Sequence, residues 1–284
     1  MSLSWRNQLR IGLSPDRLIF AAYRGGLRPG SRHRIAASGI VAVDASGAPG
    51  PHRRSSDQPL WNWQAAVDAL PSALAAAAPG KPQATVILSN HFVRYAVLPW
   101  NAALNSGDEW LAYARHRMES VHGHAVAEWD LRVSATTRNG ARMVCATDRA
   151  LLEAVGARIA ESGAELVSVQ PYLMTAFNRM RERLETDACW LVLDEPGRLT
   201  LALIRDGGWC SIRSRRVNGD WRRNLPDILE RESATLALEA PCTEVAIHST
   251  EPFDFPLPGE YRLRDLTLPH GTPATGQPLA MALQ

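Results

Sequence analysis

Residues 188–217, in the second half of the chain, read ACWLVLDEPGRLTLALIRDGGWCSIRSRRV. Two turn sequences, Glu195-Pro196-Gly197 and Asp206-Gly207-Gly208, divide this stretch into three runs. Apolar or alternating runs of this length between Gly and Pro residues are typical of successive strands in a meander. The stretch therefore predicts three strands, over Ala188–Leu193, Leu199–Arg205 and Trp209–Val217.

The segments after this meander predict one helix and two further strands. The helix spans Trp221–Leu238 and should break or kink at Pro226, because proline lacks the N–H that a helix interior needs. Apolar runs predict strands over Thr243–His248 and Tyr261–Leu266. The order from residue 188 onward is thus strand, strand, strand, helix, strand, strand.

The N-terminal third of the chain repeats this order without repeating the residues. A helix over Pro59–Ala78 starts with a proline in its first turn, and Pro71 should bend or split it. The strands are predicted over Gln8–Leu13, Arg17–Tyr23, Arg34–Asp44 and Ala84–Ser89. Two copies of three meandering strands, a helix and a parallel strand have the topology of the ribonuclease-H-like duplication in actin-like proteins.

A separate α+β unit is predicted between the two copies. Its elements are a strand over Phe92–Leu98, a helix from Ser106 or Gly107 to His122, a hairpin of Ala127–Thr136 and Ala141–Ala146, and a helix over Arg149–Glu161. A strand over Glu165–Val169 and a helix over Leu173–Leu184 then lead into the second copy. The expected domains are residues 1–91 with 164–186, an inserted subdomain over 92–163, and a shortened second half over 187–284.

Five stretches resemble a known family, and they occur in the order found in that family. They are Ile11–Leu18, Trp110–Glu119 with Trp129-Asp130-Leu131, Gly163–Asn178, Leu193–Thr200 and Arg216–Asp220. The chain resembles the PilM-type actin-like proteins of type IV pilus assembly, the MshI proteins of the MSHA pilus and the cytoplasmic domain of the type II secretion protein GspL. The resemblance implies an α/β, actin-like fold with an inserted α+β subdomain and a reduced second half.

The sequence departs from this family at the nucleotide loops. The resemblance places Ser14, Asp194 and Thr200 in the two phosphate-binding hairpins. Pro15 has no amide hydrogen to donate to a phosphate, and the Glu195 carboxylate would repel one. Asp194 as a magnesium ligand competes with a simpler role as an acceptor of turn amides, and Ser14 with a role in its own turn. We therefore expect a vestigial site, no cofactor and no enzymatic activity; an ATP-binding actin-like protein or small kinase is the alternative.

The border of the inserted subdomain is the predicted partner site. In PilM-type proteins, the resemblance implies, a groove beside this subdomain takes the cytoplasmic N-terminal peptide of the membrane protein PilN. The corresponding residues here are Phe92, Arg94, Tyr95, Trp100 and Trp110. Burial in the core is the competing explanation for each of these residues. The resemblance also leaves open a contact with an assembly ATPase and a homodimer.

Composition and spacing argue against several other functions. The chain has 284 residues and a net charge of +2, which gives no electrostatic reason to expect nucleic acid as a partner. His116, His122 and His124 lie near Glu119, but a metal site there needs a helix through Gly123, so none is expected. In the basic run Arg213-Ser214-Arg215-Arg216, alternation puts Arg213 and Arg215 on one face, either solvated or partner-binding.

Two further expectations concern location and role. No apolar run approaches the roughly 18 residues needed to span a bilayer, and the N-terminus lacks the apolar region of a signal peptide. The expected protein is a cytoplasmic scaffold that reaches the inner membrane through a bitopic partner and links it to cytosolic components of a pilus or type II secretion machine. A regulatory module without a secretion role is a second alternative.

Overall fold

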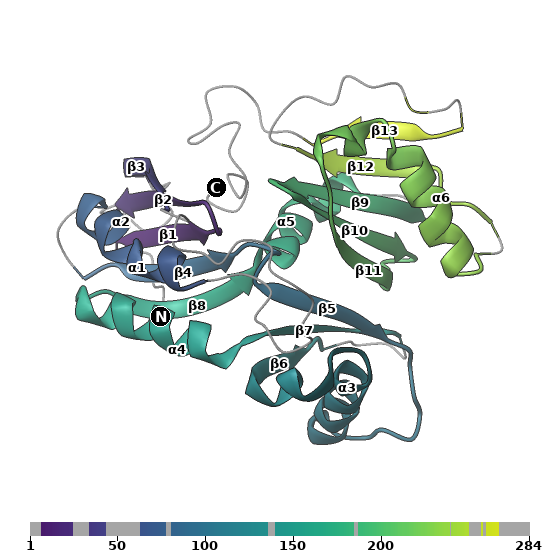
Figure 1. Ribbon diagram of the computed structural model, residues 1–284, viewed down its shortest axis with the longest axis horizontal. Helices are drawn as coiled ribbons and strands as arrows, with labels where there is room; N and C mark the ends of the chain where they lie inside the picture. Colours follow the sequence, from purple (N-terminus) through teal and green to yellow (C-terminus); the bar gives the residue numbers. More distant parts are fainter. Residues whose placement is uncertain are drawn as a thin grey trace.

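Three β-sheets organise the protein in a computed structural model, which describes residues 7–24, 34–43, 63–77, 81–135, 140–184, 187–238, 240–249, 257 and 260–266. Two of the sheets have five strands each, and the third has three. Figure 1 shows the two larger sheets side by side, with the smaller sheet below them. None of the helices in these ranges is long and apolar enough to cross a membrane.

The first sheet is a meander extended by two parallel strands. It contains β1 (Gln8–Leu13), β2 (Arg17–Arg24), β3 (Arg34–Ala42), β4 (Gln83–Leu88) and β8 (Glu165–Pro171), in the order β3-β2-β1-β4-β8. β1 pairs antiparallel with β2 and parallel with β4. The buried side chains of β1 and β4 form a core with three helices, α1 (Gln64–Asp68), α2 (Leu70–Ala76) and α4 (Arg149–Glu161).

The second sheet repeats this topology. It contains β9 (Ala188–Glu195), β10 (Arg198–Arg205), β11 (Gly208–Arg216), β12 (Glu244–His248) and β13 (Arg262–Asp265), in the order β11-β10-β9-β12-β13. β9 is buried on both faces, which explains its nearly continuous apolar sequence: Trp190 and Val192 pack with α6 (Leu225–Thr235), whereas Leu191 and Leu193 pack on the opposite side. The predicted duplication of topology is confirmed.

One hydrophobic core joins the two halves. Its centre is α5 (Tyr172–Met180), which lies between the two large sheets in Figure 1 and is followed by the 3-10 turn η3 (Arg181–Arg183). Tyr172 and Leu173 are buried in a cluster that includes Ile19 and Ile87 of the first sheet. The same cluster contains Leu191 of the second sheet, so the halves pack as one body.

The inserted unit is a three-stranded sheet covered by one helix. It contains β5 (Val93–Leu98), β6 (Trp129–Val133) and β7 (Arg142–Asp148), in the order β5-β7-β6, so β5 is an edge strand. The covering helix, α3 (Gly107–His122), packs through Trp110, Ala114 and Met118. Gly123 has a φ of +68°, a conformation that favours glycine, and it ends α3 at this point. The helix therefore stops before His124.

Proline and local packing change several predicted boundaries. The helix predicted over Trp221–Leu238 is divided into the 3-10 turn η4 (Gly219–Arg222) and α6, because Pro226 lies in the first turn of α6, where no amide hydrogen is needed. Pro71 lies equally early in α2 and separates it from α1. The strand predicted from Ala127 begins at Trp129, after the 3-10 helix η2 (Gly123–Glu128). The predicted helix start at Pro59 lies outside the described residues.

The packing of α4 differs from the predicted grouping of elements. The sequence assigns this helix to the inserted subdomain over 92–163, but Leu151, Val155 and Ile159 are buried in the core of the first sheet. The reason is that α4 leaves β7 and returns the chain to β8, which pairs with β4 of that sheet. The domain boundaries themselves remain a prediction.

Candidate functional site

The turn between β1 and β2 satisfies its own polar groups. Ser14 is buried, and its hydroxyl donates to the Arg17 carbonyl over 2.7 Å and to Asp16 Oδ1 over 3.0 Å. The Ser14 amide donates to the same Arg17 carbonyl over 3.1 Å. Ser14 therefore stabilises its own turn, which is the alternative to phosphate binding considered in the sequence analysis.

A carboxylate from the second half bridges to the first half next to the turn between β9 and β10. Glu195 ends β9 and is 1% exposed. Its Oε1 accepts from the Ser89 hydroxyl over 2.5 Å, and its Oε2 accepts from the Asn90 amide over 3.1 Å. Ser89 and Asn90 directly follow β4. We call Ser14, Ser89, Asn90, His91 and Glu195 the hairpin junction.

Burial controls the charge state of the hairpin junction. The His91 ring contacts the Ser89 hydroxyl at 2.8 Å, and burial, followed by the nearby Arg198 guanidinium, lowers its pKa to about 3. Burial raises the pKa of Glu195 to about 7, although its hydrogen bonds from Ser89 and Asn90 act in the opposite direction. At neutral pH the junction therefore holds a neutral histidine and a carboxyl group that is only partly ionised.

Asp194 and Thr200 are both engaged with neighbouring side chains. Asp194 Oδ2 accepts from the Ser249 hydroxyl over 2.8 Å and lies 3.3 Å from an Arg222 guanidinium nitrogen. The same Arg222 nitrogen donates to Ser249 over 2.9 Å. The buried Thr200 hydroxyl lies 3.1 Å from that of Ser214. The Asp194 and Thr200 contacts are separate, because Thr200 pairs with Leu193 and therefore lies on the face of the sheet opposite Asp194.

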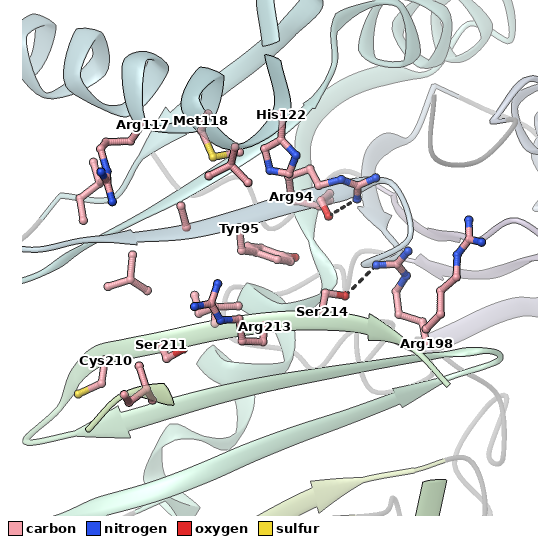
Figure 2. Close-up of a pocket in the computed structure, with 18 residues that line it drawn as sticks. Arg94, Tyr95, Arg117, Met118, His122, Arg198, Cys210, Ser211, Arg213 and Ser214 are labelled. Atoms are coloured by element: carbon pink, nitrogen blue, oxygen red, sulfur yellow. Dashed lines mark hydrogen bonds between the residues drawn. The ribbon is translucent and has the colours of Figure 1, made fainter. Parts of the chain in front are cut away.

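A groove of about 600 Å³ runs along the free edge of β5. Figure 2 shows α3 on one side of this strand and β11 on the other, with Tyr95 between β5 and β11. Charged side chains in its lining are the arginines Arg94, Arg117, Arg198, Arg213 and Arg216. Among the described residues that line it, none is Asp or Glu. We call this surface the β5 groove.

The predicted partner residues divide between the β5 groove and the interior. Arg94 and Tyr95 line the groove, and the Tyr95 hydroxyl donates to Asn90 over 2.7 Å. Phe92 and Trp110 are only 8% and 1% exposed and belong to hydrophobic cores, so packing accounts for both. Trp100 is 38% exposed, and its ring stacks on Trp110 at 5.8 Å.

Comparison with solved structures identifies the fold. The cytoplasmic domain of EpsL, an inner membrane component of the type II secretion system of Vibrio cholerae, is 12% identical with a TM-score of 0.58, over 98% of this chain and 92% of that one. A PilM-PilN type IV pilus biogenesis complex is 13% identical with a TM-score of 0.57, over 84% of this chain and 80% of that one. A Bacteroides thetaiotaomicron protein with an actin-like ATPase fold and unknown function is 12% identical with a TM-score of 0.55, over 86% and 82%.

The chain has an actin-like fold. This confirms the fold class expected from the repeated strand order and from the resemblance to PilM and GspL. No protein-family model matches the chain, and no curated protein matches it in sequence. At the identities given above, the similarity to solved structures establishes the architecture and not the activity.

Several groups in these two regions have no local sequence signal. Ser89, Asn90 and His91 form an ordinary turn sequence, and only the pairing of distant strands brings them to Glu195. Arg117 lies on an exposed helix face, as many arginines do. Two sequence signals point to the groove: the predicted partner residues Arg94 and Tyr95, and the basic run at the end of β11. Of that run Arg213 and Arg216 line the groove, whereas Arg215, which alternation groups with Arg213, is not among its lining residues. In the described residues, no three His, Cys, Asp or Glu side chains converge as metal ligands.

Proposed function

We propose that this protein is a non-enzymatic scaffold at the cytoplasmic face of the inner membrane. Its role is to link an inner-membrane component of a type IV pilus or type II secretion system to cytosolic components. It reaches the membrane through a bitopic protein whose cytoplasmic peptide it binds, in the manner of PilN. The actin-like fold supports this role, because two of the similar structures belong to such systems.

The observation that carries the proposal is the bridge from Glu195 to Ser89 and Asn90. An actin-like nucleotide site needs backbone amides and hydroxyls that face a phosphate between the two hairpins. Here the Asn90 amide and the Ser89 hydroxyl donate to a protein carboxylate instead. A phosphate at this place would have to displace a buried, hydrogen-bonded acid. This arrangement supports the proposal that the region between the two hairpins does not bind a nucleotide.

The remaining nucleotide positions support the same conclusion. Pro15 and Pro196 occupy the two turns and have no amide hydrogen. Asp194, the candidate magnesium ligand, already accepts from Ser249 and pairs with Arg222. Releasing it would leave the Arg222 cation without this carboxylate. We therefore propose a scaffold whose function includes no nucleotide-dependent step.

The β5 groove is the proposed binding site for the partner peptide. Arg94 and Tyr95 supply a charged and an aromatic contact in its lining, while Trp100 lies near the same unit, stacked on Trp110. Phe92 and Trp110 are buried in hydrophobic cores, where they stabilise the positions of β5 and α3. A contact with an assembly ATPase and a homodimer are secondary proposals.

Capture of the membrane partner tests this function. The tagged full chain, crosslinked in its native cells and purified, should bring down a bitopic inner-membrane protein identified by mass spectrometry. Val121 lines the groove and is 74% exposed, so Val121→Trp should block capture; Val167, 48% exposed on β8, gives the matched control Val167→Trp. Failure to capture any bitopic protein, or equal capture by both variants, would contradict the proposal.

A further inference from the structure

The β5 groove concentrates positive charge, because five arginines line it and none of the described lining residues is Asp or Glu. Two of the described carboxylates lie near its arginines. Glu232 on α6 is 3.7 Å from Arg213, and Glu195 is hydrogen-bonded to Ser89 and Asn90. The Glu195 pKa of about 7 leaves that group partly protonated at neutral pH. Arg198 therefore lies near a carboxyl group that is only partly charged, whereas Arg213 pairs with the partly buried Glu232.

At one end of the groove the buried Arg198 and the half-buried Arg94 lie close to each other. Figure 2 shows Arg94 and Arg198 approaching this end from opposite sides. Arg198 is 5% exposed; its terminal nitrogen donates to Ser214 over 2.9 Å, but its buried Nε has no hydrogen-bond partner among the described residues. Burial and then the neighbouring Arg198 and Arg216 lower the pKa of Arg94 to about 9. A buried cation without a full set of acceptors is costly, so this end is suited to an anionic group.

The backbone of β5 offers a second mode of recognition. Among the described strands β5 pairs only with β7, so its outer edge offers N–H and C=O groups that an extended peptide can pair with, apart from the Val93 carbonyl, which accepts from Arg94 over 3.0 Å. The edge is six residues long, which corresponds to roughly 20 Å of strand. The groove volume of about 600 Å³ is within the roughly 300–1,000 Å³ typical of ligand sites.

The two walls would receive alternate side chains of such a peptide. On β5 itself, Ala96 and Leu98 pack toward α3, whereas Tyr95 and Val97 pack toward the core shared with β11. A strand added beside β5 would follow the same alternation. The α3 wall presents the exposed apolar Val121 beside Arg117, and the β11 wall presents Arg213. Acidic side chains of a bound peptide could therefore pair with Arg117 or Arg213, and apolar ones could pack against Val121.

We infer that the β5 groove binds an extended, acidic peptide segment that adds as a strand to β5 and places carboxylates against Arg94 and Arg198. The inference rests on the proposed function, since the segment belongs to the membrane partner. It adds the chemistry and the geometry of recognition. Charge complementarity favours an acidic peptide over a neutral or basic one, and the free strand edge favours a peptide over a small anion.

Selection from a phage-displayed library of random octapeptides on the whole protein tests the inference. Selected peptides should be enriched in Asp and Glu, and raising NaCl from 50 to 300 mM should weaken their binding. Arg94→Gln should weaken binding about tenfold and Arg117→Glu about fivefold or more. The control Arg231→Glu, on an exposed position of α6 outside the groove, should change it less than twofold. Arg117 is exposed, so its variant tests the groove even where Arg94→Gln lowers stability.

A backbone probe separates strand addition from simple charge attraction. A selected peptide carrying N-methyl groups on alternate amides keeps its charge but loses strand pairing, and it should bind at least tenfold more weakly. Several results would overturn the inference: no selected binders, binders without excess acid, or equal binding by the N-methylated peptide. Competition by inorganic tripolyphosphate alone at the same affinity, or a wild-type dimer that Arg117→Glu makes monomeric, would also overturn it.

The outcomes distinguish this inference from the proposed function. Capture of a bitopic protein together with selection of neutral or basic peptides would leave the scaffold role standing and reject acidic recognition. Selection of acidic peptides without any captured membrane protein would support acidic recognition by the groove and reject the proposed link to a membrane partner.

Discussion

Glu195 is the residue on which the account depends most. It ionises with a pKa of about 7 in the folded chain, against an ordinary value of 4.5. Between these pH values the folded state keeps a proton that the unfolded state has lost. The stability that this group contributes is therefore complete below pH 4.5 and is lost as the pH rises through about 7.

We predict that Glu195→Gln removes this pH dependence. A shift of this size corresponds to about 3 kcal/mol, so the unfolding free energy of the wild type minus that of the variant should fall by this amount between pH 4.5 and 8. Urea unfolding followed by tryptophan fluorescence measures the difference. Glu119→Gln, on an exposed position of α3, should track the wild type. Parallel pH profiles for wild type and Glu195→Gln would refute the assignment.

At this scale the sequence predicts only part of the site. The Glu195-Pro196 pair already indicates a carboxylate where a phosphate loop is expected. Its partners Ser89 and Asn90 are not predictable, because they lie more than one hundred residues away and meet Glu195 only when the two halves pack. Burial of Phe92 and Trp110 depends on the same tertiary packing.

The α3 helix is the element that shapes the β5 groove. It begins with a capping box, in which the Ser106 hydroxyl accepts from the Glu109 amide over 3.2 Å and the Glu109 carboxylate accepts from the Ser106 amide over 3.0 Å. The Asn105 amide, which donates to the Glu109 carboxylate over 2.6 Å, and then the Ser106 amide lower the pKa of the exposed Glu109. The helix then presents Arg117 and Val121 to the groove.

We predict that Ser106→Ala lowers the free energy of unfolding by about 1 kcal/mol, because the Glu109 amide at the start of α3 loses the hydroxyl that caps it. Ser120→Ala, an exposed position late in the same helix, should change it by less than about 0.5 kcal/mol. Chemical denaturation of the two variants measures the contrast. Equal effects would show that the cap is not what stabilises α3.

Helices and strands were predicted correctly where the apolar residues recur at a clear period and Gly or Pro residues mark the ends of the element. The strands at β1 and β4 and the helices α3 and α4 follow the apolar pattern closely. The core that α4 joins could not be predicted in the same way. The periodicity of Leu151, Val155 and Ile159 shows that one face of the helix is buried, but it does not show that the first sheet covers this face. The 3-10 helix η2 (Gly123–Glu128) could not be predicted from an alternating pattern of apolar and polar residues either.

The core around α5 makes the two halves cooperative at the scale of the whole molecule. Leu191 is fully buried in this shared core, and Leu229 is fully buried in the core of the second half alone. The same Leu→Ala substitution at each position should cost about 2–5 kcal/mol. The consequences for the first half should differ.

We predict that Leu191→Ala accelerates hydrogen exchange in α5 and β2, whereas Leu229→Ala changes exchange only in the second half. The reason is that the cavity left at Leu191 opens onto a cluster containing Leu173 and Ile19. Hydrogen exchange with mass spectrometry reads both variants in one experiment. Unchanged exchange in α5 for Leu191→Ala would contradict a shared core.

We propose that protein groups fill the region between the two hairpins where an actin-like ATPase holds a nucleotide. Calorimetric titration of the full chain with magnesium-ATP is the sharpest test of this proposal. We expect no binding heat up to millimolar nucleotide, in the wild type and in Asp194→Ala alike. Micromolar binding by the wild type that Asp194→Ala abolishes would contradict it and would restore the ATP-binding alternative.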